Sequence, residues 1–209
     1  MVSRHIDVIL NTNEILIKKI YEMENLNKKT VAILATNGFE ESELREPKRA
    51  LEKAGADVHI VSIDGGEIRG WSDGNWSTET IKVDKQIDEV TQSDYNALML
   101  PGGVINPDLL RRDAKAVNFV KSFFEKRKPV GAICHAPWLL AEADVLRGRK
   151  VTSFNSIKTD IKNAGAYWVD EEVVVDEGLV TSRSPKDLPA FCDKLVEEVY
   201  EGKHEMQTA

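Results

Sequence analysis

Short apolar runs alternate with longer amphipathic segments from residue 29 onward. Continuous apolar runs are typical of strands covered on both faces, and apolar positions three or four apart are typical of helices with one buried side. The alternation predicts an α/β fold with a mostly parallel central sheet, helices on both faces, and ligands bound beyond the carboxyl ends of the strands. We predict strands at 30–35, 58–63, 97–100, 129–134, 173–175 and 179–181, and helices at about 42–54, at 113–127, from 136 and from 184.

Three stretches add local detail to this pattern. Pro47 lies inside the first helical segment, where it predicts an early-turn position or a kink. Residues 65–93 are rich in glycine and alternate in polarity, which predicts short antiparallel excursions. The last helix opens with Ser184-Pro185-Lys186-Asp187, a pattern typical of an N-cap followed by proline and an acidic residue.

The first 28 residues differ from the rest, so we divide the chain into an extension (1–28) and one domain (29–209). Polar residues interrupt the apolar run of the extension, and no small-residue cleavage site follows it. We predict an amphipathic helix over about 14–25 with Asn13 as its N-cap. A docked or disordered leader without chemistry is favoured over membrane attachment, because the polar face mixes acidic and basic residues.

Composition narrows the classes of function. The 209 residues carry a formal net charge of −7, which argues against a nucleic-acid-binding surface. The apolar stretches are too short to span a bilayer, so we predict no membrane partner. Two cysteines are too few for a disulfide scaffold, and no histidine has metal-type neighbours. We therefore predict an acidic cytoplasmic protein, and we expect it to use no metal or other cofactor.

The strongest chemical signal is the segment Gly131-Ala132-Ile133-Cys134-His135-Ala136-Pro137. An apolar strand leads directly into Cys134 and a helix begins just after it, which is the arrangement of a nucleophile elbow. A thiol at a helix N-terminus is expected to ionise more readily than a free cysteine, and the thiolate is the attacking species. The alternative is a small buried residue that packs under a helix, and the local sequence favours neither.

Two other strand ends meet the same sheet edge. The first strand is followed by Thr36-Asn37-Gly38-Phe39-Glu40-Glu41, so a carboxyl group could share a proton with the Cys134 sulfur or act on a carbonyl substrate. Alternatively, Glu40, Glu41 and Glu43 are solvated residues that complement the N-terminus of the next helix. The strand at 97–100 ends in Pro101-Gly102-Gly103, whose backbone N–H groups could help to form an oxyanion hole.

The segments around Phe39-Glu40-Glu41, Leu100-Pro101-Gly102-Gly103 and Ala132-Ile133-Cys134-His135 together resemble the PfpI family over about residues 30–200. These are intracellular cysteine peptidase-like and stress proteins with a class I glutamine amidotransferase-like fold. The resemblance implies a flavodoxin-like three-layer sandwich, Cys134 as nucleophile beside His135, Glu40 as its acid partner, and oxyanion amides at Gly103 and His135. In peptidase members a carboxylate from an adjoining subunit orients the histidine, and Asp108 is the matching position here. A homodimer or larger homo-oligomer is implied as well.

Three functions follow as hypotheses. The leading one is a cofactor-independent cysteine enzyme of the stress response that acts on reactive carbonyls such as methylglyoxal, with Cys134 as nucleophile and Glu40 as acid and base. The second is an intracellular peptidase with a triad of Cys134, His135 and Asp108 completed across a subunit interface. The third is a redox sensor or holdase chaperone in which Cys134 oxidises instead of turning over a substrate. The expected substrate is therefore a small carbonyl compound or a peptide.

Overall fold

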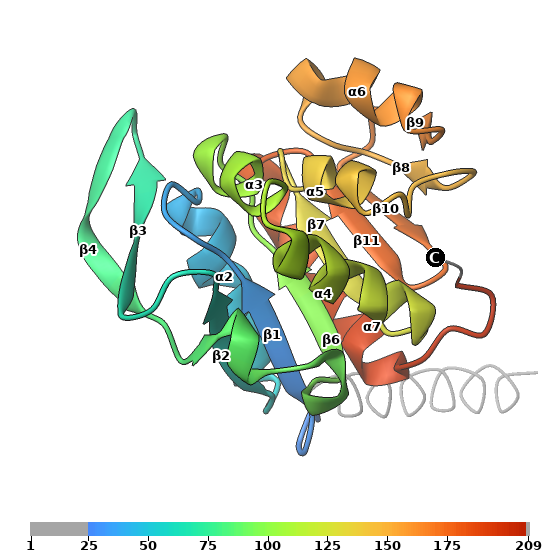
Figure 1. Ribbon diagram of the computed structural model, residues 1–209. Coiled ribbons are helices and arrows are strands. Elements are labelled where there is room, and N and C mark those ends of the chain that lie inside the picture. Colours follow the sequence, from blue (N-terminus) through green and yellow to red (C-terminus); the bar gives the residue numbers. More distant parts are fainter. Residues whose placement is uncertain (1–24, 208–209) are drawn as a thin grey trace, which may run out of the picture.

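The computed structural model describes residues 25–207 and consists of strands that alternate with helices (Figure 1). The strands are β1 (Thr30–Leu34), β2 (Asp57–Ser62), β3 (Glu67–Ser72), β4 (Asn75–Lys82), β5 (Lys85–Gln86), β6 (Ala97–Leu100), β7 (Val130–Ile133), β8 (Lys150–Val151), β9 (Tyr167–Trp168), β10 (Val173–Asp176) and β11 (Leu179–Ser182). The helices are α2 (Glu41–Lys53), α3 (Ile105–Leu110), α4 (Ala114–Glu125), α5 (Pro137–Glu142), α6 (Lys158–Asn163), α7 (Leu188–Glu201) and the short 3₁₀ turns η1 (Ile87–Glu89), η2 (Gln92–Asp94), η3 (Asn155–Ile157) and η4 (Pro185–Asp187).

A seven-stranded sheet in the order β10-β11-β7-β6-β1-β2-β5 forms the centre of the molecule. Neighbouring strands are parallel except for β10 and β11, which form an antiparallel pair at one edge. Every residue of β6, β7 and β11 is buried, which explains why these strands are apolar runs without alternation. The predicted flavodoxin-like, mostly parallel sheet is confirmed.

Helices cover both faces of the sheet and create two apolar cores (Figure 1). Helices α2 and α7 pack against each other on one face, while α3, α4, α5 and α6 lie on the other. The α7 stripe of Leu188, Phe191, Leu195 and Val199 is buried as its spacing predicts. In α4, the Asp113 carboxylate accepts hydrogen bonds from two N–H groups of the first turn and so caps the helix.

Three details differ from the sequence-based predictions. The last helix begins with η4, and Asp187 pairs with Arg183 instead of capping the helix. In the 65–93 stretch β3 and β4 form the expected antiparallel hairpin, but β5 joins the main sheet parallel to β2. Leu26 is fully buried and donates its N–H to Ala54, so packing of the domain begins before residue 29.

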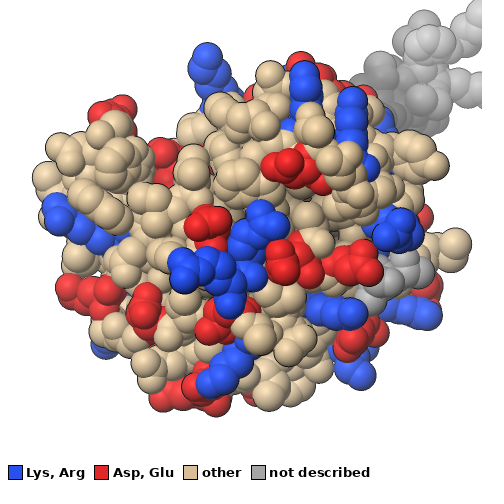
Figure 2. All heavy atoms as spheres, turned by 45° about the horizontal axis from the view of Figure 1, so that its top comes forward, with Lys and Arg blue, Asp and Glu red and all other residues tan. Residues whose placement is uncertain are grey.

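The predicted Asn13 cap and nearly all of the predicted helix over 14–25 lie outside the described residues. Within the described part of the chain, no helix is both long enough and apolar enough to cross a bilayer. On the face shown in Figure 2, lysine and arginine side chains lie among aspartate and glutamate side chains.

The parallel order β7-β6-β1 determines where the candidate active site lies. Because these three neighbours run in the same direction, the loops at their carboxyl ends leave the sheet along one edge. Those loops carry the Phe39-Glu40 segment, the Pro101-Gly102-Gly103 turn and Cys134.

Candidate active site

Cys134 occupies a sharp turn between β7 and α5. Its φ angle is 65°, in the left-handed region that few residues other than glycine adopt. The turn is fixed from two sides, because the Cys134 N–H donates to the Ser182 carbonyl (3.0 Å) and its carbonyl accepts from the Phe154 N–H (2.8 Å). The strand-to-helix elbow predicted for this position is present.

The carboxyl group that meets the thiol belongs to Glu43. Its side chain is fully buried, accepts the Gly102 N–H at 3.0 Å, and lies close enough to Cys134 that each group raises or lowers the pKa of the other. Burial, reinforced by the charge of nearby Glu40, raises the pKa of Glu43 to about 8. The carboxyl is therefore largely protonated at neutral pH and can donate a proton.

Burial also changes the state of the thiol. Cys134 is 6% exposed, and burial, followed by the charge of Glu43, raises the pKa of the thiol above its ordinary value. The N–H groups of Gly103 and His135 act in the opposite direction. The expectation of a readily ionised thiol is therefore wrong, because α5 has only six residues and its N-terminus does not outweigh burial and a neighbouring carboxyl.

Glu43 and Cys134 form a coupled acid pair. Each negative charge opposes the other, so the doubly ionised form is disfavoured and the pair retains a proton around neutral pH. The Glu43 proton can be delivered to a substrate oxygen while the sulfur attacks carbon.

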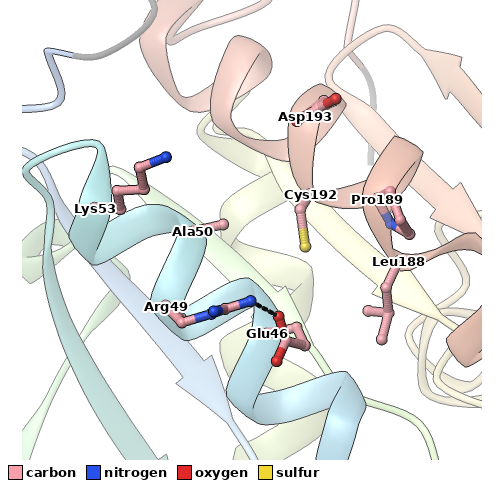
Figure 3. A pocket seen from close by; sticks show the side chains of 8 residues that line it. All are labelled: Glu46, Arg49, Ala50, Lys53, Leu188, Pro189, Cys192 and Asp193. Carbon is pink, nitrogen blue, oxygen red and sulfur yellow. Dashed lines mark hydrogen bonds and ion pairs between the residues drawn. The ribbon is translucent and has the colours of Figure 1, made fainter.

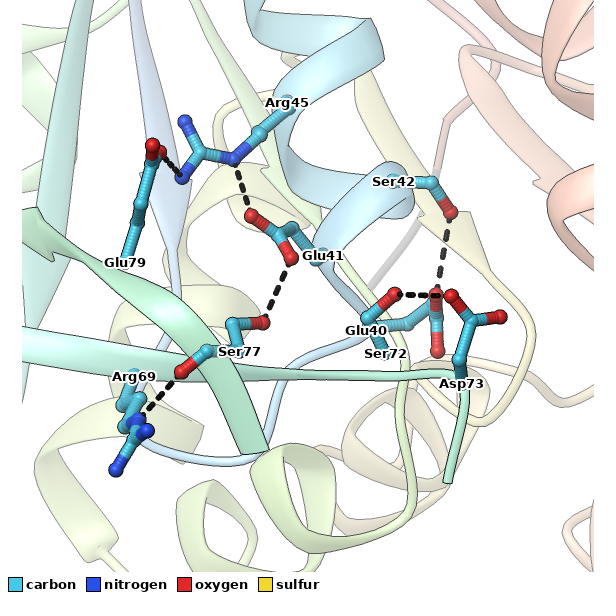
Figure 4. A network of polar contacts seen from close by, with 9 residues as sticks. All are labelled: Glu40, Glu41, Ser42, Arg45, Arg69, Ser72, Asp73, Ser77 and Glu79. Atoms are coloured by element: carbon cyan, nitrogen blue, oxygen red, sulfur yellow. Dashed lines mark hydrogen bonds and ion pairs between the residues drawn. The ribbon is translucent and has the colours of Figure 1, made fainter. Parts of the chain in front are cut away.

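Glu40, which the resemblance to the PfpI family implies as the acid partner, is placed differently. It precedes α2, accepts a hydrogen bond from the Ser42 hydroxyl (3.3 Å), and lies beside Asp73 of the β3–β4 hairpin (Figure 4). Burial, opposed by the hydrogen bond from Ser42 and reinforced by the charge of Asp73, raises the pKa of Glu40. The geometry favours Glu43 for the role at the sulfur, because it lies on the buried side of the first turn of α2, where its carboxylate reaches the Gly102 N–H.

The neighbouring acid, Glu41, forms part of the support of the hairpin (Figure 4). It accepts a hydrogen bond from the Ser77 hydroxyl at 2.7 Å and pairs with Arg45 at 2.7 Å. Arg45 also forms a salt bridge with Glu79 of β4. Glu41 thus links α2 to β4 and is not turned toward the thiol. The sequence also allowed all three glutamates to be solvated residues at the start of the helix. That interpretation is wrong for Glu43, which is fully buried.

The two glycines of the Pro101 turn have different tasks. The Gly102 N–H is engaged by Glu43, and a side chain here would have its Cβ 2.6 Å from that of Cys134. Gly103 has a φ of 78°, and its N–H lowers the pKa of both Cys134 and Glu43, so it faces the charges of this pair and is the candidate oxyanion donor. Fully buried Asn106 fixes the turn, since it donates to the Pro101 and Gly102 carbonyls and accepts from the Thr36 N–H.

His135 lies directly against the thiol. Its Nδ1 is 3.2 Å from the Cys134 sulfur, and its Nε2 is 3.1 Å from the Ser156 hydroxyl. The ring stacks on Phe154 at 4.8 Å and lies 5.3 Å from Trp138. Burial lowers the pKa of His135, so the ring is neutral at physiological pH and can accept a proton.

Two further residues singled out in the sequence lie elsewhere. Asp108 is exposed on α3, and within residues 25–207 no carboxylate hydrogen-bonds to His135; a role for Asp108 across a subunit interface stays a prediction. Cys192 projects from α7 into a pocket bordered by α2, with Glu46 and Arg49 on the opposite side (Figure 3). Burial raises the pKa of Cys192 to about 12, which makes it a poor nucleophile.

Sequence comparison places the chain among known proteins. Residues 29–198 match the DJ-1/PfpI family. The chain is 48% identical over 164 residues to "Protein/nucleic acid deglycase 2" of Escherichia coli, which covers 78% of this chain and 93% of that protein. It is 44% identical over 163 residues to "Putative cysteine protease YraA" of Bacillus subtilis, with 78% and 94% covered.

Structural comparison agrees. A two-domain protein of Anabaena variabilis with a DJ-1/ThiJ/PfpI-like domain has a TM-score of 0.77 and 36% identity, covering 82% of this chain and 48% of that one. Drosophila melanogaster DJ-1beta has a TM-score of 0.74 and 26% identity, with 83% and 94% covered. Sheet order, motifs and relatives converge, and the chain belongs to the DJ-1/PfpI family.

Proposed function

We propose that this protein is a cysteine-dependent enzyme that acts on reactive carbonyl compounds such as methylglyoxal and on their adducts. The observation that carries the proposal is the convergence of the Cys134 sulfur, the protonated Glu43 carboxyl and the Gly103 N–H within one chain. Relatives named as deglycases support the same class of reaction.

The reaction on methylglyoxal balances with these groups and water. The Cys134 thiol passes its proton to Nδ1 of His135 and the sulfur bonds to the aldehyde carbon; the carbonyl oxygen takes the proton of the Glu43 carboxyl, and a hemithioacetal results. Glu43, now a carboxylate, removes the hydrogen of that carbon as a proton and returns it to the adjacent carbon, while the proton of the hemithioacetal hydroxyl passes to the former ketone oxygen. The ketone thereby becomes an alcohol and the hemithioacetal becomes a thioester. Water then hydrolyses the thioester to lactate and regenerates the thiol. The Gly103 N–H stabilises the oxyanions.

Peptide hydrolysis is the second candidate. It is favoured by the 3.2 Å contact between His135 Nδ1 and the sulfur, the arrangement a cysteine peptidase needs. A relative named as a putative cysteine protease points the same way. We place the carbonyl reaction first, because a protonated Glu43 carboxyl near the sulfur suits proton transfer to a carbonyl oxygen, and several relatives are named as deglycases.

Four single variants test the proposal: Cys134→Ala, Glu43→Gln, Glu40→Gln and, as the control thiol, Cys192→Ala. Each is assayed for methylglyoxal loss with lactate formation, for release of the carbonyl group from glycated N-acetylcysteine, and for cleavage of a fluorogenic peptide. We expect Cys134→Ala to abolish carbonyl conversion and Glu43→Gln to lower it by about 10²- to 10⁴-fold, the range of general acid–base catalysis. Cys192→Ala should match the wild type.

The same set separates the alternatives. Carbonyl conversion that survives both Cys134→Ala and Glu43→Gln would refute the proposal. A loss in Glu40→Gln with full activity in Glu43→Gln would restore Glu40, the residue predicted from the sequence. Cleavage of the peptide alone would favour the peptidase, and peroxide-dependent suppression of client aggregation without turnover would favour the redox sensor or holdase.

We also propose a cytoplasmic location and a homo-oligomeric assembly. The acidic composition and the low cysteine content support the former, and the resemblance to an oligomeric family supports the latter. Light scattering coupled to size exclusion measures the mass of the assembly, and a single-chain mass would contradict it. Titration with duplex DNA at low salt checks the expected lack of affinity for nucleic acid, because electrostatic binding to DNA is strongest under that condition.

A further inference from the structure

The two nitrogens of His135 have partners of different kinds. Nδ1 faces the sulfur of Cys134 at 3.2 Å, and Nε2 faces the hydroxyl of Ser156 at 3.1 Å. Stacking on Phe154, with 25° between the ring planes, limits rotation of the imidazole. The ring is therefore fixed along a line that runs from the buried thiol to a hydroxyl on the exposed residue Ser156.

Which nitrogen carries the proton decides what His135 can do. A neutral imidazole has one N–H and one lone pair, so His135 can accept the thiol proton only if Nδ1 is bare and Nε2 is protonated. A hydroxyl that accepts from Nε2–H favours this tautomer and continues to accept after the ring has become positively charged. A carboxylate performs this task in catalytic triads.

The fold holds Ser156 in place by several contacts. The Phe154 N–H donates to the Cys134 carbonyl at 2.8 Å, which attaches the 154–157 segment directly to the elbow. The η3 turn follows at once, and Ile157, which is 1% exposed, anchors its end in the core. Ser156 lies between these two anchors, so the position of its hydroxyl is set by the same backbone that sets the position of the sulfur.

We propose that Ser156 is a positioning residue of the active site, which orients His135 and selects the tautomer whose Nδ1 accepts the proton of Cys134. It would give one chain the third member of a Cys–His–Ser series without a carboxylate from a neighbouring subunit. The inference deepens the proposed function and rests on it for its effect on turnover, although its effect on the thiol does not depend on the identity of the substrate.

The test compares Ser156→Ala with Ser156→Thr, which keeps the hydroxyl, and with Asn155→Ala, an exposed neighbour on the same turn. The first readout is alkylation of Cys134 by iodoacetamide, in which the sulfur displaces iodide, followed by peptide mass mapping so that Cys192 is counted separately. Rates are measured from about pH 6 to 9, across the range in which histidine and the acid pair titrate. The second readout is kcat and KM for methylglyoxal.

We expect Ser156→Ala to lower the alkylation rate near neutral pH and kcat about fivefold each, the factor associated with one neutral hydrogen bond, while KM changes less than about twofold. Ser156→Thr should recover most of the rate, and Asn155→Ala should match the wild type. A merely structural role would lower the melting temperature of Ser156→Ala without changing the pH dependence of alkylation.

Three results would overturn the proposal: an unchanged alkylation profile in Ser156→Ala, equal losses in the alanine and threonine variants, or a loss from Asp108→Asn with none from Ser156→Ala. Failure of the proposed function is distinguishable from these results. If no variant turns over a carbonyl substrate, kcat is lost as a readout, but the alkylation profile still reports whether Ser156 acts on His135.

Discussion

Replacing Glu43 by glutamine should stabilise the protein at neutral pH while it removes activity. The carboxyl is fully buried, and its pKa is raised from 4.5 to about 8. A carboxyl with a raised pKa binds its proton more tightly in the folded state, so the unfolded state releases it first as the pH increases. The contribution of Glu43 to the free energy of unfolding is therefore complete below about pH 4.5 and declines until about pH 8.

The size of the effect follows from that interval. Crossing the whole interval costs about 5 kcal/mol, and between about pH 5 and pH 7.5 the loss is about 3 kcal/mol. Glutamine has the same shape and stays neutral. Its oxygen can accept the Gly102 N–H and its NH₂ can donate to the sulfur, so the substitution removes the titration and leaves the contacts.

Urea unfolding followed by tryptophan fluorescence measures the prediction at both pH values. The free energy of unfolding of Glu43→Gln minus that of the wild type should increase by about 3 kcal/mol from pH 5 to pH 7.5. Glu52→Gln, at an exposed position of the same helix, should show no such increase. A difference between Glu43→Gln and the wild type that is independent of pH, whatever its sign, would refute the raised pKa and with it the proton-donor role.

Three further substitutions test the support of the site. Gly102→Ala places a Cβ 2.5 Å from the Glu43 carboxylate and 2.6 Å from the Cys134 Cβ, so we expect carbonyl conversion to fall by more than about 10²-fold in the kinetic assay. Asn106→Ala leaves buried backbone groups without partners and should cost about 3 kcal/mol in urea unfolding; a loss below about 0.5 kcal/mol would contradict this. Asp113→Ala removes the cap of α4 and should cost about 1 kcal/mol with activity unchanged, and a loss of activity would show that α4 affects the site.

The architecture could be predicted because burial leaves a direct pattern in the sequence. The apolar runs at 97–100 and 130–133 are buried on both faces, and the positions of Leu188, Phe191 and Leu195 match one helix face. The β5 pairing and the η4 turn were missed, because two- and three-residue elements depend on tertiary contacts that such short patterns do not encode.

The identity of the acid partner is the part of the site that the sequence leaves open. Three glutamates lie among the four residues 40–43 after the first strand, and composition cannot say which of them faces inward. The phase of the helix could have done so, because Glu43 shares the buried face of α2 with Leu44, Pro47 and Leu51, whereas Glu40 precedes the helix. The pKa of the Cys134 thiol could not be predicted from the sequence, because it depends on how deeply the folded chain buries the elbow.

The left-handed backbone at Cys134 has a consequence for the choice of an inactive control variant. Any residue with a Cβ pays roughly 1–2 kcal/mol to adopt a φ of 65°, and glycine is exempt. Alanine and serine replacements would keep that strain, whereas Cys134→Gly would release it and also remove a side chain that packs in the core. An inactive variant made with alanine or serine therefore removes the thiol while it keeps the backbone strain of the elbow, whereas a glycine variant changes both.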